Sequence, residues 1–551
     1  MKNILKISAA AVAMTLLLNS CIKEATPTDV ATEDQVTLET QVRGIPAALV
    51  QAGSTGYAQQ GAAWDFSLPA IHIATESMTG DLVVTGNIGY DWFGQWGTND
   101  ALGADYAVGA LTWDNYYTWI MMANNVINLI DASDLSALDA TERSYLGFAY
   151  AYRAMFYFDL VRLYEFKENT VTKADNLLGL GVPIVLPSTT EAEAKNNPRA
   201  KVDDIYDTII FPDLDTAEEL LSTFTPSDKY TISLPLIYGM KARAYLERGT
   251  AKNDAEAYKK AAEYARKAIT ASACTPLTQE QWEDPTNGFN NANSNNAWIW
   301  ALALPSESVS NLFCYTVHMS CENDWAPYHA GRGINRNLYN SIDTRDFRRH
   351  SWLDPDRSSY AYKSCREDSE TYFAQGLADY ANIKFRPAQG NYKDYKVGGA
   401  ADHCCMRVEE MYFIEAEATA QGGDLPGGIK LLNEFMTNYR MMNGAVYDCT
   451  AKSSTLESFV NELMLQKRIE FWGEGIVMYD MKRLNMSSKR GYVGTNAPAS
   501  YRLNVDGRAP YWNIVITRGE TQNNPIIATQ NNSRSVGPHR AVEGIMDRNI
   551  D

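Results

Sequence analysis

Segments of helix length with apolar residues on one face dominate two stretches of this chain and constrain its fold most strongly. One apolar stripe is formed by Trp113, Tyr117, Ile120, Asn124 and Ile127, and a second follows between residues 142 and 164. The same spacing continues over residues 203–221, 233–249, 253–272, 405–421, 428–442 and 454–471. Residues from about 273 to 400 instead carry many Asn, Gly, Ser and aromatic residues with little helical period. We therefore expect a mainly α protein with a large, irregular, loop-rich insert and a few short strands.

Two neighbouring segments indicate that the helices repeat as pairs. The sequence IYGMKARAYLERG is followed by AAEYARKAI, and both combine small residues with a tyrosine, Tyr245 or Tyr264. Small residues let helices approach closely, and the tyrosines can fill the remaining gaps, which predicts a tetratricopeptide-like array. An ordinary irregular helical domain is the alternative. The predicted repeats cover about 113–272 and 405–486, the variable region about 273–400, and one domain spans 41–551.

Four local signals make sharper structural predictions. Pro212 lies inside the segment 203–221 and should kink that helix. Ser454 and Glu457 have the spacing of a capping box. The apolar run AWIWALAL predicts a short strand, and a second strand is expected over residues 512–517.

The N-terminus has the pattern of an export signal. Lys2 and Lys6 precede an apolar run, which ends in Leu-Asn-Ser followed by Cys21. This ending resembles a bacterial lipobox, in which the cysteine is acylated and becomes the mature N-terminus. We expect a signal peptide over 1–20, lipidation of Cys21 and a flexible polar tether over 21–40. A plain signal peptide with a chance cysteine is the alternative.

Charge and motif content exclude several functions. A formal net charge of -18 argues against nucleic-acid binding, because a phosphate backbone requires a basic face. The sequence has no CxxC, HExxH, GxSxG or Walker motif, so no metal site, cofactor or catalytic residue is expected. The glutamates at 409, 410, 415 and 417 could suggest a carboxylate pair, but an ion-paired or solvated helix face is the preferred interpretation. Cys314 and Cys321 are close enough in sequence for a disulfide, whereas Cys404 and Cys405 are interpreted as unrelated thiols.

Two aromatic loops are the candidate binding site. The first contains Tyr90, Asp91, Trp92 and Trp96, and the second contains Asn323, Asp324, Trp325, Tyr328 and Arg332. Aromatic faces can stack on the apolar side of a sugar ring, while Asn, Asp and Arg side chains can hydrogen-bond its hydroxyls. We predict one aromatic platform that includes Trp325, Tyr328 and at least one of Trp92 and Trp96. The alternative is that these residues pack the loops onto the core. If the site instead lies elsewhere in the insert, Trp282, Trp352 and Tyr360 are the next candidates.

Six motifs follow one another along the chain: WDNYYTWIMMANNVINLI, ERSYLGFAYAYRAMFYFDLVRLY, VPIVL, NNPRAKVDDIYDTIIFPDLDTAEELL, MRVEEMYFIEAEATAQGG and LMLQKRIEFWGEGIVMYDMKRLN. In this order they resemble the motifs of the SusD/RagB family, the surface glycan-binding lipoproteins of Bacteroidetes uptake systems. The resemblance implies four tetratricopeptide-like units, a variable region carrying the site, and a SusC-like TonB-dependent transporter as partner. It transfers no individual binding residue.

These features together predict a non-catalytic surface protein that binds an oligosaccharide or polysaccharide and delivers it to the transporter. The expected location is the outer membrane, with Cys21 as the lipid anchor. Peptide binding is one alternative, and a surface glycosidase is another.

Overall fold

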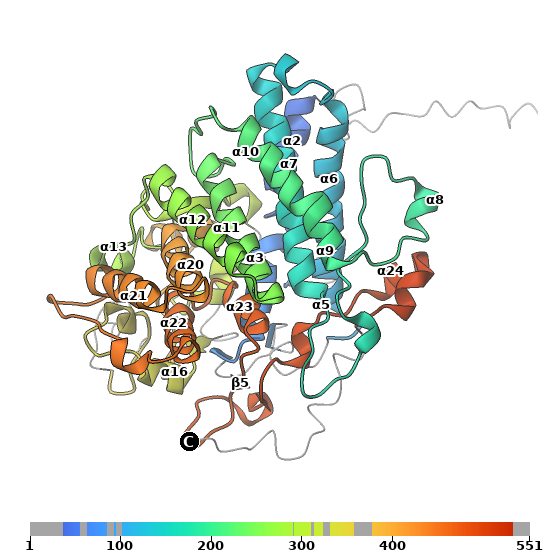
Figure 1. Cartoon of the computed structure of the whole chain (residues 1–551). Helices are drawn as coiled ribbons and strands as arrows, with labels where there is room; N and C mark the ends of the chain where they lie inside the picture. Colours follow the sequence, from blue (N-terminus) through green and yellow to red (C-terminus); the bar gives the residue numbers. More distant parts are fainter. Residues whose placement is uncertain are drawn as a thin grey trace, which may run out of the picture.

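The computed structural model describes residues 37–55, 63–84, 93–94, 102–289, 291–309, 313–322, 331–357 and 377–532, which form a helical scaffold joined to an irregular region (Figure 1). The predicted signal peptide, Cys21 and most of the predicted tether lie outside these residues. In the described part, no helix is long and apolar enough to cross a membrane.

The first half of the scaffold is organised around one long helix. Helix α7 (Ala140–Tyr164) packs beside α6 (Asn115–Leu129) and α10 (Phe211–Leu220), and α2 (Leu38–Ala48) packs on α6 (Figure 1). A capping box between Asp139 and Glu142 fixes the start of α7, because each side chain bonds a free backbone N–H of the other. The helix predicted over 142–164 is therefore confirmed. Helix α3 (Ser67–Ser77) is buried along its whole length.

The second half of the scaffold is a row of packed helices. α11 (Leu234–Lys252), α12 (Ala255–Ser272), α20 (Val408–Gln421) and α21 (Leu425–Tyr439) contact one another in that order, followed by α22 (Leu456–Glu470) and α23 (Val477–Arg483) (Figure 1). Tyr245 and Tyr264 stack between α11 and α12, with ring centroids 5.6 Å apart and an interplanar angle of 8°. A Cβ at Gly249 would lie 2.7 Å from the Tyr258 ring, so glycine is needed for this approach. The repeat-like packing predicted for this pair is confirmed.

Short elements fill the insert and join it to the scaffold. Among its described residues, the α-helices are α13 (Gln279–Glu283), α14 (Tyr315–Met319), α16 (Arg336–Asn340) and α19 (Tyr395–Gly398). Strand β1 (Leu82–Val84) pairs with β3 (Arg332–Ile334), β2 (Trp298–Leu302) pairs with β4 (His403–Arg407), and β5 (Ser488–Lys489) pairs with β6 (Asn504–Val505), all antiparallel. The smaller helices of the scaffold are α5 (Ala107–Gly109), α8 (Glu191–Ala194), α9 (Val202–Ile205) and α24 (Arg518–Asn523).

Three sequence predictions need correction, and one is refined. Pro212 lies inside a continuous helical run, as predicted, and the run is distorted by a π-helical segment (Tyr206–Ile210) directly before α10. The N-cap of α22 is Thr455 paired with Ser458, so the box predicted from Ser454 and Glu457 is wrong by one residue. The helix predicted from residue 405 begins only at Val408, because residues 403–407 form strand β4. The run 512–517 is not a strand, because it follows a 3₁₀ turn and ends at the cap of α24.

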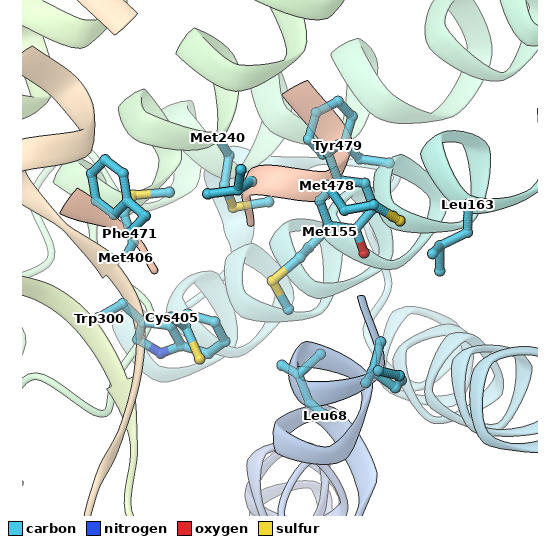
Figure 2. Close-up of a cluster of buried hydrophobic side chains, with 14 of the residues drawn as sticks. Leu68, Met155, Leu163, Met240, Trp300, Cys405, Met406, Phe471, Met478 and Tyr479 are labelled. Atoms are coloured by element: carbon cyan, nitrogen blue, oxygen red, sulfur yellow. The ribbon is translucent and has the colours of Figure 1, made fainter. Parts of the chain in front are cut away.

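The main core draws side chains from both halves of the scaffold. Figure 2 shows α3, α7, α11, β2, β4 and α23 contributing to one buried cluster. The labelled members, with Phe471 at the end of α22, are Leu68, Met155, Leu163, Met240, Trp300, Cys405, Met406, Phe471, Met478 and Tyr479. The six described cysteines are free thiols, so the pairing suggested for Cys314 and Cys321 does not form.

A cluster of paired charges lies inside this core, and we call it the paired-charge cluster. It combines four cations and four carboxylates: Arg348, Lys384, Arg407, Arg440, Asp346, Glu409, Glu470 and Glu474. The carboxylate of Glu470 accepts hydrogen bonds from Arg440 at 2.7 Å, Arg407 at 2.7 Å and Arg348 at 3.0 Å. The three guanidinium groups hold the pKa of Glu470 well below its ordinary value against the opposing effect of burial.

The glutamates of α20 are ion-paired, as the sequence favoured. Glu409 pairs with Arg407 and Arg440, Glu410 with Arg243, Glu415 with Arg266 and Glu417 with Arg483. Each carboxylate is therefore occupied by a guanidinium, which explains why this helix carries four acidic residues.

Candidate ligand-binding site

The β1–β3 sheet brings together the strand ends from which the two predicted loops continue. The first loop follows the end of β1, and β3 begins directly after most of the second loop. Val84 at the end of β1 is the pairing partner of Arg332 at the start of β3. Because the strands are antiparallel, both loops leave the sheet at one end.

Most of the predicted binding residues fall outside the described part of the chain. These are Tyr90, Asp91, Trp92, Trp96, Asn323, Asp324, Trp325 and Tyr328. Whether they form one platform therefore stays a prediction. Arg332 is the described member of the predicted set, together with residues 93–94 between the two tryptophans of the first loop.

Phe93 anchors the first loop next to the second. Its side chain is fully buried, and its ring lies edge-on to Phe66 at 6.0 Å and to His318 at 5.1 Å between centroids. The guanidinium carbon of Arg332 is 5.7 Å from the centre of the Phe93 ring. His318 and Arg332 flank the second loop in sequence, so the anchor of one loop packs against the stems of the other.

Asn382 joins the two stems of the second loop. Its side-chain amide donates hydrogen bonds to the carbonyl of Met319 at 2.7 Å and to the carbonyl of Arg332 at 3.1 Å. A buried ion pair of 3.1 Å between Arg386 and Glu322 holds the residue just before this loop. The loop therefore begins and ends on fixed, hydrogen-bonded backbone.

Arg332 does not have the position expected of a ligand-contacting residue. It is fully buried, and its guanidinium donates a hydrogen bond to the carbonyl of His318. Its location favours a role in holding the loop stem. The sequence could not separate the two roles, because Arg332 is the first residue of the strand that follows the loop.

Two of the reserve candidates are core residues. Trp282 is buried, donates its indole N–H to the Ser351 hydroxyl at 2.9 Å, and lies 5.2 Å from the guanidinium of Arg440. Trp352 is fully buried and meets Trp472 edge-on at 5.6 Å. Neither presents its ring to the surface, and Tyr360 lies outside the described residues.

Three buried titratable groups between α3, β4 and the segment after α22 form a second site, which we call the unpaired titratable site. The ring nitrogens of His72 and His403 are 2.7 Å apart. Burial lowers the pKa of His72 to about 3 and that of His403 well below its ordinary value, so both are neutral at neutral pH. Burial raises the pKa of Glu76 to about 8, and its carboxyl accepts the N–H of Gly475 at 3.2 Å.

A groove of about 1010 Å³ lies elsewhere in the scaffold. Its walls come from α2, α6, α7, the segment 224–232 and the residues at the end of β2, and it shares no lining residue with β1, β3 or the Phe93 anchor. Sequence analysis missed this groove because its walls come from five separated segments that carry no common motif.

Two family models match consecutive parts of the chain. One, described as starch-binding associating with outer membrane, matches residues 58–246, and the other, the SusD family, matches residues 278–534. The chain belongs to the SusD/RagB family. The tetratricopeptide-like helical scaffold described above is the SusD-like fold.

Solved SusD-like structures share this fold across nearly their whole length. A SusD-like carbohydrate binding protein from Bacteroides vulgatus is 20% identical, with 89% of this chain and 96% of that chain covered and a TM-score of 0.66. A SusD superfamily protein from Bacteroides thetaiotaomicron is 18% identical over 89% and 98% of the two chains, with a TM-score of 0.65. Surface glycan-binding protein A from Bacteroides uniformis is 18% identical over 89% and 99%, with a TM-score of 0.57. No curated protein matches the chain.

Proposed function

We propose that this SusD-like protein binds an oligosaccharide or polysaccharide at the cell surface without modifying it. The observation that carries the proposal is the shared anchorage of the two aromatic loops: both leave one end of the β1–β3 sheet, and Phe93 packs against His318 and Arg332 beside the second loop. Two of the similar solved structures are themselves described as carbohydrate- or glycan-binding.

The ligand chemistry follows from the residue types in the loops. Trp and Tyr rings supply stacking surfaces that lose little side-chain entropy on binding, and Asn and Asp satisfy sugar hydroxyls. Stacking on a neutral sugar is not an ionic contact, so affinity should depend little on salt. The net charge of -18 favours a neutral ligand over a polyanionic one.

The proposal includes where the protein works and what it works with. Cys21 carries the lipid anchor, the protein is displayed at the outer membrane, and a SusC-like TonB-dependent transporter receives the ligand. Family membership and the Leu-Asn-Ser-Cys sequence support this part. In a strain without the transporter, Cys21→Ala should release the protein from the membrane; retention of that variant would show that lipid is not the anchor.

Affinity electrophoresis in polysaccharide gels tests the binding function. Trp92→Ala, Trp96→Ala and Trp325→Ala are compared with the parent, and Tyr395→Ala serves as a control because this half-exposed tyrosine lies outside both loops. At least one tryptophan variant should lose binding by roughly 2 kcal/mol or more, as a central aromatic contact does. Melting curves confirm folding. If all three variants fold and bind as the parent does, the binding site is not formed by these tryptophans.

Two further measurements separate the alternative functions. Release of reducing ends from the same polysaccharides would indicate a glycosidase and would contradict a binding-only role. Calorimetric titration with glycans and with peptides distinguishes carbohydrate recognition from peptide recognition. We expect heat from at least one glycan, no heat from peptides and no reducing ends.

A further inference from the structure

The groove between α2, α7 and the end of β2 has an aromatic floor. Tyr145 and Phe148 project from one side of α7 with ring centroids 6.4 Å apart, and Phe148 meets Phe224 edge-on at 5.2 Å. Tyr145 and Phe224 are only half-buried, so part of each ring remains open to the groove. Open aromatic surface in a concave site is where an apolar ring face can be buried.

Tyr152 adds a polar group to this floor. It lines the groove, is only 3% exposed, and its ring is held by Phe156 and Trp300. Its hydroxyl has no hydrogen-bond partner among the described residues, whereas the buried hydroxyls of Tyr116 and Tyr157 are both bonded. Burial raises the pKa of Tyr152, so the hydroxyl remains a protonated donor. The hydroxyl does not belong to the fully enclosed polar atoms that lack a partner, so it can donate to a hydroxylated ligand in the groove.

The two charged groups at the groove already have partners within the protein. Among the residues that line it, Arg43 and Asp228 are the charged ones. Arg43 donates to Glu39 at 2.8 Å, and Asp228 accepts the backbone N–H groups of Tyr230 at 2.9 Å and Thr231 at 3.0 Å. Both charges are therefore already bonded to protein groups, and the rest of the groove offers rings, hydroxyls and amides, which match a neutral ligand.

We propose that this groove is a second carbohydrate site, which binds a short neutral oligosaccharide independently of the two aromatic loops. The inference relies on the proposed function only for the class of ligand. The volume of about 1010 Å³ is at the upper end for a small-molecule site, which suits several linked sugar rings. An alkyl chain would fit the rings but would leave the Tyr152 hydroxyl without a partner, so the groove favours a sugar.

The methyl group of Met122 provides a direct measure of occupancy, because this half-buried residue lines the groove. The probes are maltohexaose, cellohexaose, xylohexaose and mannohexaose, each titrated into full-length protein with ¹³C-methyl methionine and followed by NMR. Met122→Leu assigns the signal. We expect at least one hexaose to shift the signal saturably, and Tyr152→Phe, which removes only the unpartnered hydroxyl, to weaken that binding several-fold.

Two tryptophan substitutions separate occupancy from indirect effects. Ala303→Trp fills the exposed edge of the groove and should abolish the shift, while Ala251→Trp, on an exposed turn of α11 outside the groove, should leave it unchanged. Trp92→Ala should also leave the Met122 shift unchanged, so this measurement distinguishes loss of binding at the groove from loss of binding at the loops. If no hexaose shifts the signal, if Ala303→Trp has no effect, or if octanoate alone produces the shift, the second-site proposal is wrong.

Discussion

The paired-charge cluster and the unpaired titratable site lie in the same core, but the buried groups are ionised in the first and neutral in the second. In the first, Glu470 is ionised because three guanidinium groups surround it. In the second, Glu76 forms no ion pair with any described residue, and burial keeps the carboxyl protonated and the two histidines neutral. Burial alone therefore does not fix the charge of a titratable residue in this core; the number of opposite charges within reach does.

Removing the central carboxylate of the paired-charge cluster should have the largest effect. Glu470→Gln leaves Arg348, Arg407 and Arg440 without one of their shared partners, and breaking a buried ion pair on one side costs about 3–5 kcal/mol. Urea unfolding measures the loss. A change below about 1 kcal/mol would mean that the remaining carboxylates satisfy the three cations without Glu470.

Glu76→Gln tests the opposite case. The folded-state pKa of Glu76 is about 8, above its ordinary value of 4.5, so its contribution to stability is fully present below 4.5 and is lost as pH rises through 8. Between pH 5 and pH 8 the parent should lose roughly 2–4 kcal/mol relative to the glutamine variant. The measurement is the free energy of unfolding of both proteins at each pH; equal pH dependence would show that Glu76 is ionised in the folded protein.

The histidine pair should act at acidic pH. The pKa of His72 is lowered from 6.5 to about 3, so the unfolded chain takes up a proton below pH 6.5 while the folded chain does not. Stability contributed by the neutral histidine is therefore lost as pH falls from 6.5 toward 3, by about 2 kcal/mol at pH 5. His72→Gln should reduce this dependence relative to the parent. Parallel stability curves for the two proteins from pH 7 to pH 5 would contradict the assignment.

An exposed pair provides the smallest expected effect. Glu191 and Lys195 on α8 are 84% and 64% exposed and form an i,i+4 pair. Solvent and salt screen such pairs, so Glu191→Gln should leave the free energy of unfolding within experimental error at every pH. If the free energy of unfolding instead fell as much as in Glu470→Gln, loss of any carboxylate would destabilise this acidic protein. The effect of Glu470→Gln could then not be attributed to its buried ion pairs.

Sequence periodicity predicted the helices well because each buries one face whose spacing is visible locally. The helix of residues 140–164 and the pairing of Tyr245 with Tyr264 are examples. The paired-charge cluster could be foreseen only in part: the sequence favours an ion-paired or solvated helix face for Glu409, but its partner Arg440 is set by tertiary contact alone. The strand predicted over 512–517 failed because apolar character does not specify a pairing partner.

The candidate site was predictable in composition but not in detail. Aromatic and amide residues marked two loops, and the structure places their stems side by side through Val84 and Arg332. Arg332 and Trp282 have the chemistry of binding residues, yet both are buried, and only three-dimensional packing reveals this. The groove with Tyr152 had no sequence signal, because the missing hydrogen bond of a tyrosine is a property of its surroundings.

The β1–β3 sheet also has a consequence for how the protein acquires its structure. Leu82 and Ile334 are neighbours in the sheet although some 250 residues separate them along the chain. Closing so large a loop is entropically costly, and contacts of this separation slow folding. The helix pair α11–α12 can form from local contacts as soon as it emerges, whereas α3 must wait for Gly475, whose carbonyl accepts the Thr75 hydroxyl at 2.7 Å. We therefore expect the loop-bearing sheet to be among the last parts of the molecule to mature, so that a chain truncated before α22 would keep helices but have no organised binding surface.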